Sequence, residues 1–534
     1  MDALNFLLSN GRSTEIPGFN TDPDTLVKTT VCASPSSTEN SQNNAWNVNF
    51  SDGNTNNNNK YNSNAVRAVA ALGEEIKEGW VAAFHDCCRN KKSSHNCNAY
   101  RAADWELDLW LLVYEIYILH QYTPKPSNCF IVTRPTLREI FAADFRDRIV
   151  QHWICLRLEP LFDKRHREQG DVSHNCRKGY GTSSAIKALE RDIKEVSENY
   201  TRDAWVAKID IRSFFMSIDT RILWGFLRDF INENYHEADK DTLLYLTEVT
   251  VMHRPQENCI RKSPLEFWEM LAAHKSLFNN PEFIGLAIGN ITSQLEANFD
   301  MSFYVEVIKP EAEERGARIE QFVDDVACVA PDKETCIWFR KRSQEILKER
   351  LNLTIHPNKF YCQHVKKGVK FVGQVIMPGR RYISNRTVGN FIEELRRAER
   401  LCRRITAGEV TAATLYELRH HVSAINSYLG FMIHCASYRL REKIFRRECR
   451  AFWQTCYTAH FDVCHIKVKY DIKQFLINQE IKDYGMDLHR DRAKAGRNPN
   501  APRTKAAHRQ LPHTRGKRRR QRAGLQLPAQ GRHA

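Results

Sequence analysis

The chain has 534 residues, too many for a single hydrophobic core, and its length suggests about three domains. Hydrophobic residues make up 42% and aromatic residues 10%, enough for a globular protein, but no apolar run approaches the roughly 18 residues of a membrane span. The net charge of +15 is uneven, because residues 485–534 hold fourteen Lys or Arg against two Asp, which is +12. These numbers argue against a membrane-spanning protein and predict a globular body with a basic tail.

The cysteines and the N-terminus indicate a cytoplasmic protein. The sixteen cysteines are scattered singly apart from Cys87-Cys88, and no basic-then-apolar signal pattern opens the chain, so we expect reduced thiols. The stretch HDCCRNKKSSHNC (85–97) lacks paired CxxC spacing, so zinc is not the preferred interpretation there.

Periodicity divides the chain into segments. Residues 1–73 are rich in Asn, Ser, Thr and Gly, which predicts disorder, and helical spacing follows over 74–122. LREIFAADFRDRIVQHWICLRLEPLF (137–162) predicts a second helical block. WVAKIDI (205–211) and RIEQFVDDVACVA (318–330) are typical of strands, and the pattern becomes helical again beyond residue 382.

The basic tail, 485–534, has too few apolar residues to bury a core, so we expect disorder. Its RGKRRRQR stretch would bind phosphates non-specifically through counterion release. A solvated tail without a dedicated role is an equally good interpretation.

Three aspartates carry the chemistry that the sequence predicts. Asp324-Asp325 lie between two β-prone runs, at the expected tip of a hairpin, and Asp210 ends another β-run that then enters a helix. Asp is common in turns, so the pair alone would not indicate a site. Bringing the three together without a cation would be costly, and carboxylate oxygens suit Mg²⁺. Two metal ions about 4 Å apart would support phosphoryl transfer.

Six segments of the chain form an ordered set of motifs: FIVTRPTLREIFAADFRDRIV (130–150), VSHNCRKGYGT (172–182), DIRSFF (210–215), FVDD (322–325), LNLTIHPNKF (351–360) and GVKFVGQVI (368–376). In this order they resemble the motifs of reverse transcriptases, and the resemblance covers roughly residues 76–443. In FVDD, Phe322 stands where the commoner motif has tyrosine. The resemblance implies an RNA-directed DNA polymerase with an α+β right-hand fold.

The resemblance also implies domain limits. We expect a helical N-terminal extension and fingers over 74–204, a palm with an antiparallel catalytic sheet and interleaved fingers elements over 205–380, and a helical thumb over 381–484. Disordered segments, 1–73 and 485–534, would flank them.

One segment narrows the family. Most reverse transcriptases carry Q-G-x-x-x-S-P where this chain has IGNITSQ (288–294), and enzymes of diversity-generating retroelements share the aliphatic first and glutamine last residue. Isoleucine offers shape but no hydrogen bond, so a mispair of similar shape is poorly rejected. The resemblance implies misincorporation opposite template adenines. A drifted loop in an intron-mobility or phage-defence enzyme is the alternative, as is a catalytically silent nucleic-acid-binding relative.

Residue roles follow from the resemblance. Asp210, Asp324 and Asp325, with Ile211, would bind two Mg²⁺ ions, for which Mn²⁺ could substitute. Lys359 would donate a proton to the leaving pyrophosphate or screen its charge, or be a plain surface lysine. The deoxynucleotide-binding set is Arg177, Lys178, Phe215 (the steric gate against ribose), Ile288, Gly289, Ser293 and Gln294.

The remaining expected contacts are to nucleic acid. Phe371, Val372 and Gly373 would form the primer grip. Asn426, Tyr428 and Arg439 would touch the template–primer duplex. For Phe215 the other interpretation is a core phenylalanine, and for Arg177 and Lys178 a solvated basic loop.

Twelve asparagines between Asn40 and Asn64 raise a separate hypothesis. Asparagine codons are rich in adenine, so this stretch resembles a translated template repeat, and WNVNFSDGNTNNNNKYNSNAVRAV (46–69) resembles the variable segment of such systems. An ordinary polar low-complexity tail is the alternative. The resemblance implies three partners: template RNA, deoxynucleoside triphosphates and a small basic accessory variability protein. It also implies a bacterial or phage origin and mutagenic retrohoming into a target gene.

Overall fold

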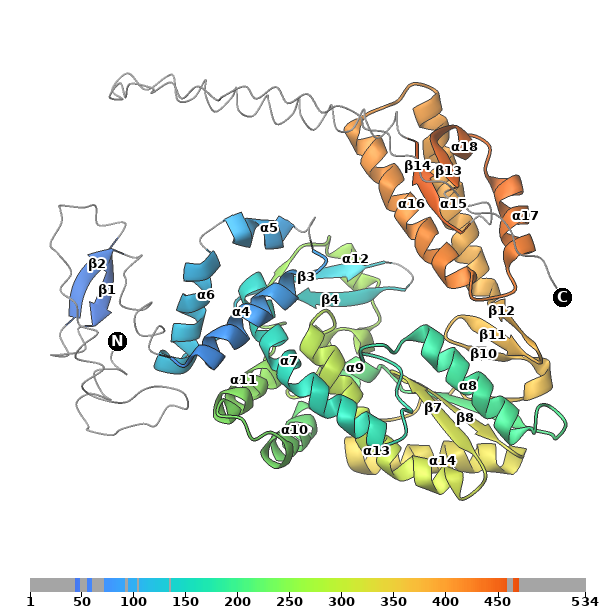
Figure 1. Ribbon diagram of the computed structural model, residues 1–534, viewed down its shortest axis with the longest axis horizontal. Coiled ribbons are helices and arrows are strands. Elements are labelled where there is room, and N and C mark those ends of the chain that lie inside the picture. Colours follow the sequence, from blue (N-terminus) through green and yellow to red (C-terminus); the bar gives the residue numbers. More distant parts are fainter. Residues whose placement is uncertain are drawn as a thin grey trace, which may run out of the picture. The chain divides into compact units, whose positions relative to one another are not determined.

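The computed structural model (Figure 1) describes residues 72–91, 95–102, 105–133, 136–458 and 464–469, and the backbone of two strands before them. These residues form a mixed arrangement of helices and sheets. The chain divides into two compact units, Met1–Ile392 with Tyr428–Arg441, and Glu393–Ser427 with Glu442–Ala534.

A four-stranded antiparallel sheet organises the first unit. Its strand order is β7-β8-β5-β9, from β5 (Trp205–Asp210), β7 (Arg318–Phe322), β8 (Asp325–Ala330) and β9 (Tyr361–His364). The strand predictions for 205–211 and 318–330 are confirmed. A short helix, α9 (Phe214–Ser217), follows β5 as the sequence indicated.

Both faces of this sheet are buried, and successive side chains of each strand point to opposite faces. Val326, Cys328 and Ala330 face the larger core with α13 (Ile291–Glu313) and α14 (Lys333–Leu351). Ala327 and Val329 face a second core with α8 (Thr182–Val196). In Figure 1, β7 and β8 accordingly lie between α8 and α14. This double burial explains why VACVA is continuously apolar.

Helices from before and after β5 surround α7 (Phe145–Glu168), which begins after the N-cap Asp144. Trp153 of α7 stacks on Trp80 at 5.0 Å, and Arg157 lies over the Trp153 ring at 3.6 Å. The neighbouring helices are α4 (Glu74–Cys88), α5 (His95–Ala102), α6 (Trp105–Tyr114) with the π-turn η2 (Glu115–Leu119), α10 (Thr220–Asn234) and α11 (Lys240–Met252). The helical interpretation of 74–122 is confirmed for most of its described length.

The prediction of one helix over 137–162 is wrong at its start. Arg138–Ala142 form β4, which pairs antiparallel with β3 (Ser127–Val132), and the helix begins only at Phe145. REIFA fits a strand because Glu139 and Phe141 alternate as buried residues with their neighbours. A third strand, β6 (Cys259–Arg261), pairs parallel with β3.

The segment after β6 consists of short turns. It contains α12 (Glu266–Glu269), η3 (Ala273–Lys275) and η4 (Leu277–Asn279), and neither α12 nor η3 has a buried residue. Another small sheet, β10 (Val369–Phe371), β11 (Gln374–Met377) and β12 (Arg380–Ile383), follows η5 (Val365–Lys367) and packs on the α8 side of the main sheet.

The second unit contains parts of α15 (Asn385–Thr406), α16 (Ala412–Met432) and α17 (Tyr438–Glu448). It also holds α18 (Phe452–Thr455) and an unpredicted pair of strands, β13 (Cys456–Thr458) and β14 (Ile466–Val468). Leu395, Leu401 and Leu418 are buried. The Glu399 carboxylate accepts the N–H groups of residues 450–452, which ties α15 to the turn before α18. The helical prediction beyond residue 382 is confirmed.

The terminal segments are described only in part. In the Asn-rich stretch, β1 (Asn44–Val48) pairs antiparallel with β2 (Thr55–Asn59). Most of 1–73 and all of 485–534 lie outside the described residues, so their expected disorder stays a prediction. The described cysteines form no disulfide, and none of the described helices has the length and apolar character of a membrane span.

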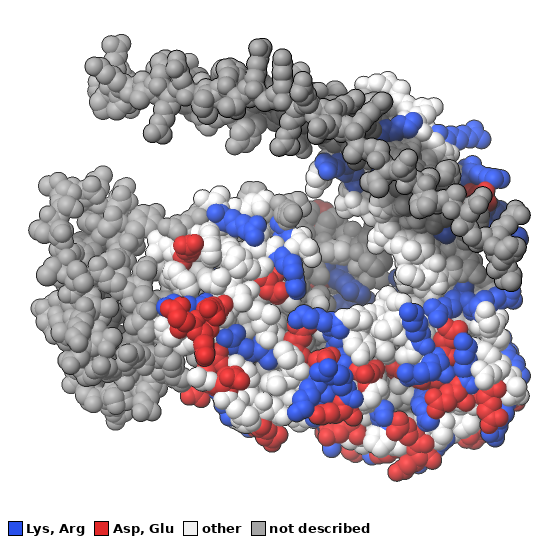
Figure 2. Space-filling view, viewed as in Figure 1, with Lys and Arg blue, Asp and Glu red and all other residues white. Residues whose placement is uncertain are grey.

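Charges on the first unit are largely paired. Figure 2 shows Lys and Arg interspersed with Asp and Glu over the area of α8 and α14. Arg342 Nε lies 2.8 Å from Glu311, and an Arg318 guanidinium nitrogen lies 2.6 Å from Glu195. This mixed surface agrees with a body that is nearly neutral outside its basic tail.

Truncating the Phe299 ring tests the packing between α13 and α7. Phe299 is fully buried and stacks on Phe162 at 4.1 Å. We expect Phe299→Ala to lower the free energy of unfolding by about 3–5 kcal/mol, because the cavity refills poorly. Urea unfolding followed by tryptophan fluorescence measures this change. The control, Ile337→Ala on the exposed side of α14, should change it by no more than about 0.5 kcal/mol, and equal effects would contradict this packing.

Candidate active site

The pairing of β5 with β8 brings the three predicted aspartates together. Asp210 is the last residue of β5 and is the register partner of Asp325, the first residue of β8. Directly paired residues have Cα atoms about 4.5–5.5 Å apart. Asp324 lies in the turn before β8, and its carbonyl accepts the Ile211 N–H at 3.3 Å. Two strand ends therefore present three carboxylates at one edge of the sheet.

The turn that carries Asp324 is strained. It joins β7 to β8 through two residues, and Val323 has a φ of 59°, a conformation that β-branched residues rarely adopt. Gln321 supports the turn, because its side-chain Nε2 donates to the Val323 carbonyl at 3.0 Å. Such local strain persists only where surrounding contacts determine it, and it is common at functional sites.

Two lysines neutralise part of the acidic cluster. Lys359 Nζ lies 2.7 Å from an Asp210 oxygen, and Lys208 Nζ lies 2.9 Å from an Asp325 oxygen. Lys359 follows the loop in which His356 N–H donates to the Asp210 carbonyl. Lys359, predicted as a catalytic residue, is therefore brought to the aspartates. Its ammonium group is 53% exposed and free to exchange partners, whereas Lys208 is 18% exposed and lies beside the Phe371 ring.

Within the part of the chain that the structure describes, the third carboxylate, Asp324, forms no ion pair with a lysine. Burial, and then the neighbouring charge of Asp210, raise the pKa of Asp324 to about 6. Burial also raises the pKa of Asp325, although Lys208 opposes this. The cluster is thus short of positive charge when all three carboxyls are ionised.

The chemistry of these donors fits a divalent cation. Carboxylate oxygens are the ligands that Mg²⁺ takes, and a cation would offset the repulsion that raises the Asp324 pKa. Over the described ranges, however, no three His, Cys, Asp or Glu side chains already converge as a metal site. Asp210 and Asp325 would first have to release their lysines. Ile211, also predicted beside the metal, is buried with its N–H on the turn.

Phe215 and Ile288 lie on two segments that are joined by a backbone hydrogen bond. Phe215 is half-buried in α9, and its carbonyl accepts the Leu286 N–H at 2.7 Å. Ile288 is half-buried against a small cluster that includes Phe141 and Met216. Its carbonyl accepts the Phe141 N–H at 2.8 Å. The structure therefore connects the predicted sugar gate and the predicted base-contacting residue to one segment.

Three further residues of IGNITSQ, Gly289, Ser293 and Gln294, differ in how closely they are packed. Gly289 has a φ of +128°, and a Cβ there would lie 2.6 Å from the Phe141 carbonyl oxygen, so only glycine fits. Ser293 is buried in the first turn of α13, while Gln294 is exposed. Of these two predicted residues, only Gln294 presents its side chain to the surface.

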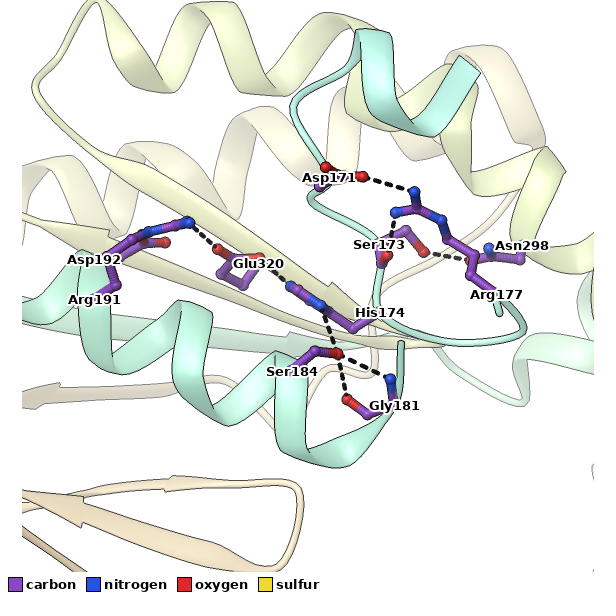
Figure 3. A network of polar contacts seen from close by, with 10 residues as sticks. All are labelled: Asp171, Ser173, His174, Arg177, Gly181, Ser184, Arg191, Asp192, Asn298 and Glu320. Atoms are coloured by element: carbon purple, nitrogen blue, oxygen red, sulfur yellow. Dashed lines mark hydrogen bonds and ion pairs between the residues drawn. The ribbon is translucent and has the colours of Figure 1, made fainter. Parts of the chain in front are cut away.

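The two predicted phosphate-binding cations behave differently. Arg177 is turned inward (Figure 3), where its guanidinium contacts Asp171 at 2.6 Å and Asp163 at 2.8 Å and stacks on Tyr180. It holds the 172–182 loop together, and the structure does not bring it to the aspartates. Lys178 is 66% exposed and lies 2.6 Å from Glu159. Only Lys178 is accessible to a ligand here.

The same loop is attached to β7. Ser173 bridges to Gln321, with backbone hydrogen bonds from His174 N to Gln321 O and from Gln321 N to Val172 O. His174 also contacts Glu320 at 2.7 Å and Ser184 at 3.1 Å (Figure 3). Gln321 thus holds both the turn that carries Asp324 and the 172–182 loop.

The predicted primer grip is a tight hairpin. Phe371 is buried in the core beneath the sheet, and Val372 and Gly373 form the two-residue turn between β10 and β11 with φ values of 41° and 81°. Phe371 therefore anchors the hairpin, and Val372 and Gly373 form its tip.

The three residues predicted as thumb contacts differ in their exposure and in their partners. In the second unit, Asn426 exchanges two hydrogen bonds with the Ile466 backbone, at 2.8 and 2.7 Å, and so ties α16 to β14. In the first unit, Tyr428 is half-buried near Phe391 and Arg439 is exposed on α17. Arg439 is the one of the three whose side chain is exposed.

The sequence did not lead us to two features near the site. Arg138 is exposed at the start of β4, next to the β3–β4 turn. The β-like alternation of REIFA was the sequence signal that could have identified this strand. A polar pocket of about 260 Å³ lies beside α9, with Arg212, His274 and Thr354 in its lining. No sequence signal joins those three residues, which come from the turn after β5, from η3 and from the segment after α14.

Comparison with known proteins gives one family. Residues 123–376 match the family described as "Reverse transcriptase (RNA-dependent DNA polymerase)". This range contains the β5–β8 edge, the 172–182 loop and IGNITSQ. No curated protein matches the chain.

Solved structures give distant matches. Apo telomerase from Candida tropicalis, truncated at its C-terminal domain, is 14% identical with a TM-score of 0.35 over 49% of this chain and 56% of that one. Telomerase from Candida albicans in complex with a TWJ fragment of telomeric RNA is 11% identical with a TM-score of 0.36, over 61% and 55%. The chain thus spans little more than half the length of either protein, and scores this low carry no argument about function.

The raised pKa of Asp324 predicts a pH-dependent stability. Folded Asp324 binds its proton more tightly than the unfolded chain does, so its ionisation destabilises the fold as pH rises from about 4 through 6. At pH 8, Asp324→Asn should raise the free energy of unfolding by about 1–2 kcal/mol, and the gain should vanish near pH 4. Thermal unfolding from pH 4 to 8 measures this difference.

Magnesium provides the second arm of that experiment. Added Mg²⁺ should raise the melting temperature of the wild type at pH 8 more than that of Asp324→Asn, since an ion that binds only the folded state stabilises it. The control is Glu233→Gln, which changes an exposed carboxylate on α10. A gain for Glu233→Gln equal to that for Asp324→Asn would contradict the assignment.

Proposed function

We propose that the reverse transcriptase domain formed by residues 123–376 makes this chain an RNA-directed DNA polymerase that diversifies a target gene. The observation that carries the polymerase activity is the register pair Asp210–Asp325 with Asp324 in the adjoining turn. A module that only bound nucleic acid would gain nothing from three clustered acids facing a phosphate backbone.

Chemistry at this edge would be mainly positioning and charge neutralisation. Asp210 and Asp324 would hold two divalent cations, Mg²⁺ or in its place Mn²⁺, with Asp325 in support. Bound there, such ions would neutralise charge on the attacking 3′-oxygen, the α-phosphate and the leaving oxygen. Lys359, released from Asp210, would lie within reach of the leaving pyrophosphate, as a proton donor or as a screening charge.

The substrate pocket would be bounded by the segments around α9. Phe215 would stand under the sugar and exclude a 2′-hydroxyl, while Ile288 and Gly289 would lie near the base. Lys178, the accessible cation of the 172–182 loop, would meet the triphosphate in preference to Arg177, whose partners hold it inside. Arg138, exposed on β4, is a further candidate for that contact.

In this proposal the domains correspond to a right hand. The β3–β4 hairpin and the 172–182 loop would be fingers, the β7-β8-β5-β9 sheet the palm, and the helices after residue 385 the thumb. Val372 and Gly373 would contact the primer end, and Arg439 and Tyr428 the duplex. Asn426 would act structurally, because β14 already uses both ends of its amide.

The diversifying role depends on IGNITSQ. Ile288 packs in an apolar cluster and has no side-chain hydrogen bond to offer a base, so it would reject mispairs poorly. The Asn-rich segment agrees with a translated template repeat, and a basic accessory protein would help handle the RNA. A second genomic copy of codons 40–70 that differs only at adenines would support this part, and the absence of any such copy nearby would count against it.

Primer extension on an RNA template tests the polymerase activity. With Mg²⁺ and all four deoxynucleotides the wild type should extend the primer, and Asp324→Ala should be slower by about a thousandfold or more, because the charge on the phosphate would be left uncompensated. Glu233→Ala, an exposed carboxylate on α10, serves as the control. An active Asp324→Ala variant would overturn the site.

Sequencing the products separates the diversifying role from its alternative. Errors concentrated opposite template adenine would support the retroelement enzyme. Faithful copies, or errors spread evenly over the four bases, would leave the polymerase and favour an intron-mobility or phage-defence role.

Exchanging Ile288 for glutamine tests the specificity argument. A side chain that can hydrogen-bond should reject mispairs that isoleucine admits, so Ile288→Gln should lower the error rate opposite adenine by about tenfold. The matched control, Ile291→Gln, makes the same change three residues on, where the side chain is 38% exposed. If both variants kept the wild-type error spectrum, Ile288 would have no part in selecting the base.

A further inference from the structure

Glu139 is a carboxylate buried where the sequence predicts no site. It lies on β4, opposite Ile131 of β3, and its side chain is 0% exposed. None of the ion pairs recorded among the described residues involves it. A buried carboxylate is retained only where several donors satisfy it.

Three donors converge on this carboxylate, and all come from the segment after β6. Trp268 Nε1 donates at 2.9 Å and Ser276 Oγ at 2.8 Å to one oxygen, while the Leu277 N–H donates at 2.8 Å to the other. The helices α12 and η3 bury no residues of their own. The segment is held by the hydrogen bonds to Glu139, by the apolar contacts of Trp268, Leu277 and Phe278, and by Arg261, which lies over the Trp268 and Phe278 rings.

The segment held by Glu139 continues directly to the substrate side of the site. Asn280 Nδ2 donates to the Met216 carbonyl at 2.8 Å, and Leu286 N–H donates to the Phe215 carbonyl at 2.7 Å. Gly285 N–H donates to the Ile218 carbonyl at 2.7 Å. The backbone of α9, which carries the Phe215 ring, is thus supported from residues 280–286.

Packing connects the same residues. Leu277, Met216 and Phe141 share one small hydrophobic cluster with Ile288 against it, separate from the two cores that enclose the main sheet. A shift of residues 276–277 would therefore reach Ile288 through this cluster and the Phe215 backbone through residues 280–286. The Phe215 ring itself packs against the larger core, which also contains Ile209 and Val326.

We propose that Glu139 is a positioning residue for the nucleotide pocket: through Ser276 and Leu277 it fixes the wall that places Phe215 and Ile288. This inference rests on the proposed polymerase function. It predicts that Glu139 sets the affinity for the incoming nucleotide and the discrimination between deoxyribose and ribose, while the aspartates and Lys359 set the chemical step.

The test is steady-state kinetics of Glu139→Gln with deoxynucleotides and with ribonucleotides. Glutamine keeps the shape of the side chain, but its NH₂ group would face one or more of the donors from Trp268, Ser276 and Leu277. At least one hydrogen bond is therefore lost. We expect KM for the deoxynucleotide to rise about tenfold and deoxy-over-ribo discrimination to fall by a similar factor, with kcat within about twofold of wild type. The control is Glu269→Gln on α12, an exposed carboxylate of the same segment, which should match the wild type.

Ser276→Ala provides a second variant that leaves the buried charge in place. It removes one donor and should shift KM and sugar discrimination in the same direction by a smaller factor, which matters if Glu139→Gln fails to fold. In the double variant, Ser276→Ala should change KM and sugar discrimination by less than it does alone, because Ser276 and Glu139 share one hydrogen bond.

The outcomes distinguish the two proposals. An inactive wild type would refute the polymerase function itself. An active wild type with Glu139→Gln and Ser276→Ala indistinguishable from Glu269→Gln would overturn the positioning role. A fall in kcat with unchanged KM and unchanged sugar discrimination would also overturn it, because that result would place Glu139 in the chemical step.

Discussion

The pairing of β5 with β8 is the constraint on which the rest of the site depends. It sets Asp210 opposite Asp325 and leaves Asp324 in the connecting turn, so three like charges share one sheet edge. Their repulsion opposes the pairing, and among the described residues Asp210 and Asp325 each form an ion pair with a lysine whereas Asp324 forms none. The arrangement therefore persists because other contacts hold the strands together, and the excess negative charge is what a cation or a metal-bound triphosphate would relieve.

Those other contacts come from both faces of the sheet and from its edge strand β7. Side chains of β8 are buried alternately against α13 with α14 and against α8. At the edge, Gln321 bonds to Val172 and His174 through its backbone and to Val323 through its side chain. One residue thus couples the strained turn that carries Asp324 to the 172–182 loop.

Local pattern was sufficient to predict the strands that carry the three aspartates and insufficient for the 172–182 loop. The apolar β-runs placed Asp210 at a strand end and Asp324 in a hairpin turn. The site itself was inferred from the resemblance, because Asp is common in turns. Arg177 could not be placed from the sequence, because an Arg-Lys pair before two glycines has the composition of a phosphate-binding loop, and its true partners, Asp163 and Asp171, are chosen by the fold. The strand β4 was missed because five residues with mixed alternation were merged into the helix that follows them.

Glu139 shows a deeper limit of the same kind. Its three donors lie between 129 and 138 positions away along the chain, and an acidic residue in an alternating run otherwise indicates a solvent-facing side chain. Among the groups that would touch a substrate, the aspartates are readable from the sequence because their charge interrupts apolar β-runs at strand ends. Residues that hold those groups in place are satisfied by distant partners, and in this chain that difference divides the aspartates from the wall behind Phe215 and Ile288. Selectivity for the nucleotide would then depend on contacts that no motif contains.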